Sequence, residues 1–221
     1  MPEALIIDAI RTPMGRKGGQ LSEVRGDQLL AECLKALVKR NGFDPAEVED
    51  VVGGCVTQTD EQGVCVIRQA VLASGWPKTV PGVSLNRLCG SGQQAVAFAA
   101  QEILSGQSDL TVGCGMENMS RVAMGSDMGP FNDELSKRFD VVSQGISAEL
   151  MAERWALTRA ELDAFSATRA RLRPWTPAAS RARSSRSPSV RARSAQTRVR
   201  AATRAPPRSA GSARPSSQTG S

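Results

Sequence analysis

Short apolar runs alternate with segments of helical spacing along residues 4–166 of this 221-residue chain. The expected strands are brief apolar runs bounded by Gly, Pro or polar residues, and they span residues 4–10, 49–56, 82–86 and 109–112. The expected helices place apolar residues three or four positions apart, and they span residues 27–39, 63–73 and 92–104. This alternation predicts an α/β layered domain with a largely parallel sheet.

Two of these helices have further features that can be interpreted from the sequence. Asp27 is expected to be the N-cap of the first helix, because a short acidic side chain can accept hydrogen bonds from the free N–H groups there. The helix over residues 92–104 consists mainly of small and apolar residues. We therefore expect this helix to be buried on most sides.

The pattern becomes less regular after residue 119. Residues 120–146 contain several Gly, Asp and Ser, and we expect them to form an extended loop. Two more helices are expected over residues 147–155 and 158–165. In the second of these, Thr158 and Glu161 have the spacing of a capping box.

The composition changes abruptly at residue 167. All 22 acidic residues lie at or before Asp163, whereas 13 of the 28 basic residues are arginines beyond that point. Such a segment cannot bury enough apolar surface to offset its ordering entropy, so we expect a disordered basic tail over residues 167–221. The net charge of +6 thus arises from the tail, and nucleic acid is not an expected partner of the body. The other domains are expected to span residues 1–119 and 120–166.

Several kinds of site are excluded because the sequence lacks the residues or segments that they require. The chain contains no histidine, which excludes histidine-ligated metals and any Ser-His or Cys-His pair within it. An odd number of cysteines, five, indicates free thiols instead of a disulfide framework. The chain has neither a secretory leader nor a run of about 18 apolar residues, so we expect a cytoplasmic protein that does not span a membrane.

The most informative stretch is VSLNRLCGSGQQA at residues 83–95, where a strand, a tight turn and a helix meet at Cys89. A thiol at a helix N-terminus lies near unpaired N–H groups and the positive end of the helix dipole, which favour the thiolate. Gly90 and Gly92 allow a sharp turn and a close approach of substrate. Cys89 is therefore the candidate nucleophile. Most cysteines are small buried apolar residues, and we expect this of Cys33, Cys55, Cys65 and Cys114.

Four segments resemble the thiolase family in order and spacing. Residues 86–95, NRLCGSGQQA, closely resemble the acyl-enzyme signature of thiolases. Residues 7–15, IDAIRTPMG, resemble the opening strand and turn of the family, and residues 113–120, GCGMENMS, its glycine-rich segment. Residues 144–149, QGISAE, resemble the start of the loop domain that covers coenzyme A. The resemblance extends from about residue 3 to residue 166.

The resemblance implies the layered thiolase fold, built from two similar βαβαβαββ halves, with this chain as the N-terminal half. It implies an acyl-CoA C-acyltransferase in which Cys89 is the acyl-thioester nucleophile and its backbone N–H helps to form an oxyanion hole. It also implies acyl-CoA and coenzyme A as partners, a homo-oligomer, and neither a metal nor another cofactor. Ser143 and Gln144 favour a degradative 3-ketoacyl-CoA thiolase of fatty-acid β-oxidation over a short-chain biosynthetic one.

Two features of the family are missing. Thiolases have a second half that supplies a histidine in a Gly-His-Pro segment and a second catalytic cysteine near the C-terminus. This sequence has neither motif, so we expect a truncated chain that is inactive alone. The composition of residues 167–221 is what a GC-rich gene gives when it is translated out of frame. We therefore expect a frameshift near codons 166–170.

Other functions are open on the sequence alone. The chain can be a non-catalytic α/β fragment or a binding module whose basic tail attracts anionic partners. A ketoacyl synthase shares the fold and the cysteine nucleophile, although residues 115–120 favour a thiolase. Fast alkylation of Cys89 at neutral pH separates an enzyme from a binding module, because a binding module does not need an activated thiol.

Overall fold

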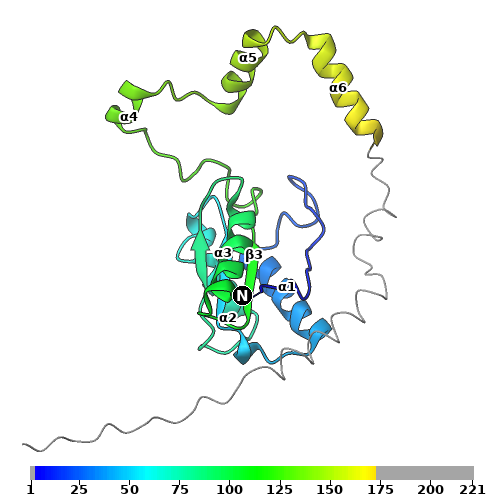
Figure 1. Cartoon of the computed structure of the whole chain (residues 1–221), viewed down its shortest axis with the longest axis vertical. Helices are drawn as coiled ribbons and strands as arrows, with labels where there is room; N and C mark the ends of the chain where they lie inside the picture. Colours follow the sequence, from blue (N-terminus) through cyan, green and yellow to red (C-terminus); the bar gives the residue numbers. More distant parts are fainter. Residues whose placement is uncertain (1–2, 173–221) are drawn as a thin grey trace, which may run out of the picture. The chain divides into compact units, whose positions relative to one another are not determined.

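The computed structural model describes residues 3–172 of the chain, which divides into two units, Met1–Ala156 and Leu157–Ser221. Figure 1 shows the helices and strands of the described part. In chain order they are α1 (Gly26–Asn41), the 3-10 helix η1 (Pro45–Glu47), β1 (Asp50–Gly54), the 3-10 helix η2 (Asp60–Gln62), α2 (Val66–Ala73), β2 (Val83–Leu85), α3 (Ser91–Ser105), β3 (Thr111–Gly115), α4 (Asp133–Arg138), α5 (Gln144–Arg154) and α6 (Arg159–Leu172).

The three strands form one parallel sheet in the order β2-β1-β3. β1 is the central strand, and its Val52 is in register with Val83 of β2 and Gly113 of β3. Each strand is connected to the next by a helix, α2 between β1 and β2 and α3 between β2 and β3. Parallel strands require such crossovers, so the expected α/β layered fold is confirmed.

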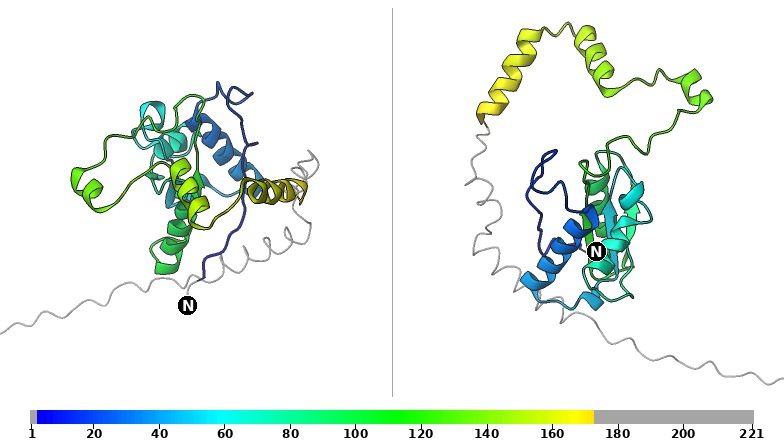
Figure 2. Two further views of the ribbon diagram at one scale, coloured as in Figure 1. Left: turned by 90° about the horizontal axis from the view of Figure 1, so that it is seen from above. Right: turned by 180° about the vertical axis from the view of Figure 1, so that it is seen from behind.

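The sheet has helices on both faces (Figures 1 and 2), and a separate core lies on each face. Successive side chains of a strand point to opposite faces, so Val51 and Val52 belong to different cores. Val51 faces α1 and α2, and its core contains Leu30, Leu34, Val48, Cys55, Val66, Ile67, Ala70, Val71, Trp76 and Val80. Val52 faces α3, and its core contains only Ala95 and Ala99 besides Val52 itself.

The expectation that α3 is buried on most sides is wrong. The helix buries only Ser91, Ala95 and Ala99. On its other sides apolar residues are exposed, including Leu104 (45%). Only the side of α3 that faces the sheet is covered by other described residues.

Residues 4–10, which were expected to form the first strand, belong to no strand. A strand needs a neighbour for its backbone N–H and C=O groups, and no described residue provides one here. Apolar side chains of this segment remain exposed, and Ile6 is 81% exposed. The segment is held by Asp8, whose carboxylate accepts hydrogen bonds from Arg40 Nη2 (3.2 Å) and Asn41 Nδ2 (2.7 Å) at the end of α1.

Two helices begin differently from what the sequence indicates. Asp27 is not the N-cap of α1, because it lies within the first turn. Its carboxylate binds Arg25, the residue before the helix, with Nη2 and Oδ2 2.9 Å apart. α2 begins three residues later than expected, because Val64 and Cys65 have φ angles of +48° and +54° and so cannot continue a right-handed helix.

The region after the sheet is less extended than expected. α4 lies within residues 120–146, and the side-chain oxygen of Asn132 caps it by accepting a hydrogen bond from Glu134 N (2.8 Å). The helix expected over residues 147–155 is confirmed as α5. No described residue in the range 123–168 is buried, so these helices have no core of their own.

The capping box of α6 is confirmed. Thr158 Oγ1 donates to Glu161 Oε2 (2.8 Å) and accepts from Glu161 N (3.3 Å), and the backbone N–H of Thr158 donates to the same carboxylate. These bonds hold the pKa of Glu161 below its usual value. α6 continues to residue 172, so the first six residues of the expected tail are helical, and the rest of the tail lies outside the described residues. No helix within residues 3–172 is both long and apolar enough to cross a membrane.

Candidate active site

Cys89 lies in the turn that connects β2 to α3, two residues before the helix begins. Its side chain is exposed, whereas Cys55 is buried and the other three cysteines are partly buried. Leu88, the residue before it, has a φ angle of +46°, in the left-handed region that residues other than glycine rarely adopt. The structure therefore confirms the expected strand, turn and helix, and it shows a strained residue next to the cysteine.

Two neighbouring side chains hold this turn. Ser91 Oγ donates to Leu88 O (2.6 Å) and accepts from Arg87 N (2.8 Å). Asn86 Oδ1 accepts from Leu88 N (2.8 Å), and Asn86 Nδ2 donates to Val56 O (2.9 Å). These hydrogen bonds satisfy backbone groups of the turn, and they offset the cost of the left-handed residue, about 1 kcal/mol.

Glycines let the start of α3 lie directly against the sheet. A Cβ atom on Gly54, the last residue of β1, would be 2.4 Å from the carbonyl carbon of Ser91 and 2.5 Å from Gly92 N. A Cβ atom on Gly115, the last residue of β3, would be 3.3 Å from Gly92 Cα. Three backbones thus meet at the carboxyl edge of the sheet, which is where open α/β sheets bind their ligands. Cys89 precedes the helix that begins at this edge.

Three of the other thiols lie in surroundings that favour the protonated form. Burial raises the pKa of Cys114 to about 12. Burial, with a smaller contribution from the carboxylate of Glu117, also raises the pKa of Cys55 to about 12. The pKa of Cys33 is raised for the same main reason. Cys65 is partly buried, and its Sγ donates to a backbone carbonyl 3.3 Å away. The structural role expected for these four residues agrees with their surroundings.

Glu117 is the important residue that the sequence analysis missed. Its carboxylate accepts hydrogen bonds from Val56 N (2.8 Å), Thr57 N (3.3 Å) and Gln62 Nε2 (2.7 Å). These bonds join the loop after β1 to the segment after β3, although the partners are 55 to 61 residues apart in the chain. The only sequence signal is an acidic residue within the glycine-rich segment of residues 113–120.

An ion cluster ties the same two segments to the start of α1. Glu61 accepts from Arg121 Nε (2.6 Å) and Nη2 (2.9 Å), and also from Arg25 Nη1 (3.2 Å). The Arg121 guanidinium holds the pKa of Glu61 below its usual value. Bidentate pairs of this kind add geometric specificity as well as energy.

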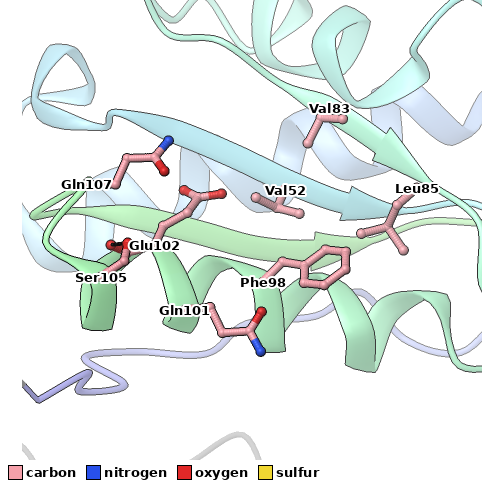
Figure 3. Close-up of a pocket in the computed structure, with 8 residues that line it drawn as sticks. All are labelled: Val52, Val83, Leu85, Phe98, Gln101, Glu102, Ser105 and Gln107. Atoms are coloured by element: carbon pink, nitrogen blue, oxygen red, sulfur yellow. Dashed lines mark hydrogen bonds between the residues drawn. The ribbon is translucent and has the colours of Figure 1, made fainter.

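An open groove of about 460 Å³ runs along the α3 face of the sheet (Figure 3). It is lined by Val52, Val83, Leu85, Phe98, Gln101, Glu102, Ser105 and Gln107. In Figure 3, Phe98 and Glu102 extend from α3 toward the strands. Burial, with the nearby Asp50 as a smaller cause, raises the pKa of Glu102, and its Oε2 has no hydrogen-bond partner among the described residues. Cys89 does not line this groove, so the groove is separate from the nucleophile.

The arrangement can support attack by an exposed thiol on an electrophilic carbonyl. The sequence provides no imidazole that could accept the thiol proton. Among residues 3–172, no group of three or more Cys, Asp or Glu side chains is placed to hold a metal ion.

Comparison with known proteins decides the family. Residues 4–174 match the family model described as the N-terminal domain of thiolase, which is more than half of the chain. The chain belongs to the thiolase family. The match extends past residue 166, where the resemblance was expected to end, and it includes the whole of α6.

The chain spans less than half the length of the thiolases that it matches. It is 44% identical over 168 residues to a 3-ketoacyl-CoA thiolase of Psychrobacter cryohalolentis, covering 74% of this chain and 42% of that protein. It is 43% identical over 171 residues to a 3-ketoacyl-CoA thiolase of Colwellia psychrerythraea, covering 76% and 44%. The crystal structure of the Bacillus anthracis acetyl-CoA acetyltransferase matches with a TM-score of 0.58 and 34% identity, covering 72% of this chain and 43% of that chain.

Proposed function

We propose that this thiolase chain supplies the acyl-accepting cysteine, Cys89, of an acyl-CoA C-acyltransferase. The observation that supports this most directly is the exposure of Cys89 in the turn between β2 and α3, while the other four cysteines are partly or fully buried. The proposed substrates are 3-ketoacyl-CoA and acetyl-CoA, because the relatives are named 3-ketoacyl-CoA thiolase and acetyl-CoA acetyltransferase. The proposed pathway is the β-oxidation of fatty acids in the cytoplasm.

In the proposed half-reaction, the Cys89 thiolate attacks the thioester carbonyl carbon of an acyl-CoA. The carbon–sulfur bond to Cys89 forms, the bond to the coenzyme A sulfur breaks, and coenzyme A takes up the proton that the thiol lost. With a 3-ketoacyl-CoA, the attack falls on the 3-keto carbon. The bond between C2 and C3 then breaks, and the released carbanion is protonated to acetyl-CoA. Both routes give the same acyl-Cys89.

A complete catalytic cycle needs a base and an acid that this sequence does not contain. There is no histidine in the chain, and the relatives are more than twice as long as the matched region. We propose that these groups belong to a second half-domain, and that the active form is a homo-oligomer of the two-half protein. No metal or redox cofactor is part of this proposal.

Peptide mass mapping after incubation with acetyl-CoA tests the site of acylation. Trypsin leaves Cys89 and Cys114 on one peptide, which begins at Leu88 and ends at Arg121, so a second cut after Glu102 is needed to separate them. We expect the acetyl group on Cys89, its loss in Cys89→Ser, and its retention in Cys114→Ser. An adduct on Cys33 or Cys65, with Cys89 unmodified, would refute the assignment.

Steady-state thiolysis tests the proposal that the chain does not turn over alone. General acid–base groups contribute about 10²–10⁴-fold each, so the loss of both should make turnover undetectable. The assay follows the consumption of acetoacetyl-CoA with coenzyme A, and a full-length thiolase serves as the positive control. A turnover rate close to that of the control would show that the chain contains its own acid and base.

A further inference from the structure

The Cys89 turn is held by residues of its own segment and, through Asn86, by a second segment. Leu88 is left-handed, a conformation that persists only where the surroundings over-determine it. The hydrogen bond that Leu88 N donates to Asn86 Oδ1, 2.8 Å long, fixes the backbone immediately before Cys89. The position of Asn86, together with the hydrogen bonds of Ser91 Oγ to Arg87 N and Leu88 O, therefore decides how this turn is oriented.

Asn86 is itself exposed, so packing does not fix its amide. What fixes the amide is the hydrogen bond that its Nδ2 donates to Val56 O, 2.9 Å away in the loop after β1. The Asn86 amide thus connects the backbone at Val56 with the backbone at Leu88. Any shift of Val56 is passed to Leu88 N through this side chain.

The loop that contains Val56 is fastened by the Glu117 carboxylate. Oε2 accepts from Val56 N at 2.8 Å, and Oε1 accepts from Thr57 N at 3.3 Å. Hydrogen bonds from N–H donors to a carboxylate are stronger than those between neutral groups. The two oxygens therefore hold the two successive peptide N–H groups on either side of Val56 Cα in a fixed place.

Gln62 fixes Glu117 in turn. This side chain is 1% exposed, and its Nε2 donates to Glu117 Oε1 (2.7 Å) and to Thr57 O (2.9 Å). Its Oε1 accepts from Asn118 N (2.8 Å), next to Glu117 in the chain. The carboxylate has no salt bridge with a basic residue in the described part of the chain, so these hydrogen bonds determine its orientation.

We infer that Glu117 is a positioning residue for Cys89, acting through Val56 and Asn86 on the Leu88 turn. The inference rests on the proposed function, because it assigns the Glu117 carboxylate to the preparation of that nucleophile. Glu117 does not touch the reacting atoms. It fixes the direction in which the thiol leaves the turn, relative to the start of α3.

The test measures how fast iodoacetamide alkylates Cys89 in the full chain, resolved by peptide mass spectrometry, at one pH and with native protein. In Glu117→Gln the amide brings an N–H₂ group to face the donors of Val56, Thr57 or Gln62, so the loop is released. We expect the Cys89 rate to fall about fivefold, the factor that corresponds to one hydrogen bond. Asn86→Ala should lower it equally, and the double variant should be no slower than Asn86→Ala, because both act in one chain of contacts.

Glu61→Gln is the matched control. It weakens the ion pairs to Arg121 and Arg25 and so loosens the same segments, but it does not touch Val56 or Asn86. It should lower the melting temperature and leave the Cys89 rate unchanged. Alkylation of the partly buried Cys114 reports on any general unfolding in every variant.

The outcomes separate positioning from simple stabilisation. If Glu117→Gln slows Cys89 no more than Glu61→Gln does, or if its effect multiplies with that of Asn86→Ala, the inference is wrong. If Glu117→Gln does not fold, Asn86→Ala and Glu117→Asp decide, and an unchanged Cys89 rate in both refutes the inference. Alkylation does not require acyl transfer, so a chain that fails to accept acetyl groups overturns the proposed function without affecting this result.

Discussion

The two faces of the sheet differ in how much of their apolar surface is covered. On the face of Val51, two helices enclose a core in which Ile67 and Val71 are fully buried. On the face of Val52, α3 alone covers the sheet, and the buried cluster has three members. The first face has a complete core, because residues from six helices, strands or loops pack together and exclude solvent. The second face depends on one helix whose outer side contains exposed apolar residues.

The difference shows that the α1/α2 face is stabilised by contacts within the chain, whereas the α3 face leaves apolar surface exposed. The α1/α2 face supplies most of the buried apolar area, and burial of such area is the main stabilising contribution to folding. On the α3 side, the candidate nucleophile lies in the turn just before the helix, and the open groove runs along the sheet. Four substitutions test this comparison.

Ile67→Ala should have the largest effect. Ile67 is fully buried between α2 and β1, so its removal leaves a cavity and should lower the free energy of unfolding by about 2–5 kcal/mol. The matching change on the other face is Ala99→Gly in α3, which we expect to cost about 1 kcal/mol. Urea denaturation measures both. Equal losses of unfolding free energy would mean that the two cores contribute equally to stability, which would contradict the comparison.

Gly54→Ala should have the next largest effect. The new methyl group would overlap the backbone of Ser91 and Gly92, so α3 must move away from the sheet, at a cost of about 1–3 kcal/mol. Gly92→Ala is the control, because nothing lies within 4 Å of its Cβ position. The measurement is the urea midpoint of both variants. A Gly54→Ala chain as stable as Gly92→Ala would contradict the close approach of α3.

Glu102→Gln should have a smaller effect, which depends on pH. Burial raises the pKa of Glu102 in the folded chain above its value in the unfolded chain. Below both values the carboxyl is protonated in both states and has no effect. As the pH rises from the unfolded value to the folded value, the unfolded chain releases its proton first, so stability falls. Glu102→Gln removes this loss, and we expect a gain of about 0.5 kcal/mol at pH 7.

The same variant should be as stable as the parent at a pH below both values, which denaturant midpoints at acidic and neutral pH can establish. Glu32→Gln, at an exposed position of α1, is the control and should show no such gain at pH 7. An equal gain in both variants would show that net charge, and not the burial of Glu102, is responsible.

Leu104→Ser should change stability least, by at most about 0.5 kcal/mol, because Leu104 is 45% exposed. We expect it to reduce self-association of the chain and the binding of dyes that recognise apolar surface, since it removes part of the uncovered α3 side. Leu72→Ser is the matched control, on the outer side of α2 and 48% exposed. Sedimentation and dye fluorescence compare them. If the two substitutions reduce self-association and dye binding equally, the α3 side contributes no more to either than the outer side of α2.

The sequence was sufficient to predict the elements whose signals are local. β1, α2, α3 and the turn at Cys89 were expected because their apolar spacing and glycines lie within a few neighbouring residues. The first strand was wrong for a physical reason: residues 4–10 have strand composition, but pairing depends on a partner that local sequence cannot reveal. The expectation that α3 is buried on most sides was also wrong, because its composition describes a helix and not what packs on it.

The parts of the site that the sequence did not predict are long-range contacts. Glu117 and Gln62 are 55 residues apart, and no pattern in either segment indicates that they meet. The left-handed φ of Leu88 was also unexpected, because leucine gives no signal for this conformation. Cys89 could be chosen from its motif, whereas the groups that orient its turn required the structure.

The joint of Gly54, Gly92 and Gly115 has a mechanical consequence. Where side chains separate a helix from a sheet, rotamer changes can absorb small displacements before the helix moves. Here backbone meets backbone, and no compressible layer lies between them. A shift at the end of β1 must therefore reach the start of α3 at nearly full amplitude. In this respect the start of α3, just after the cysteine turn, behaves as a rigid extension of the central strand.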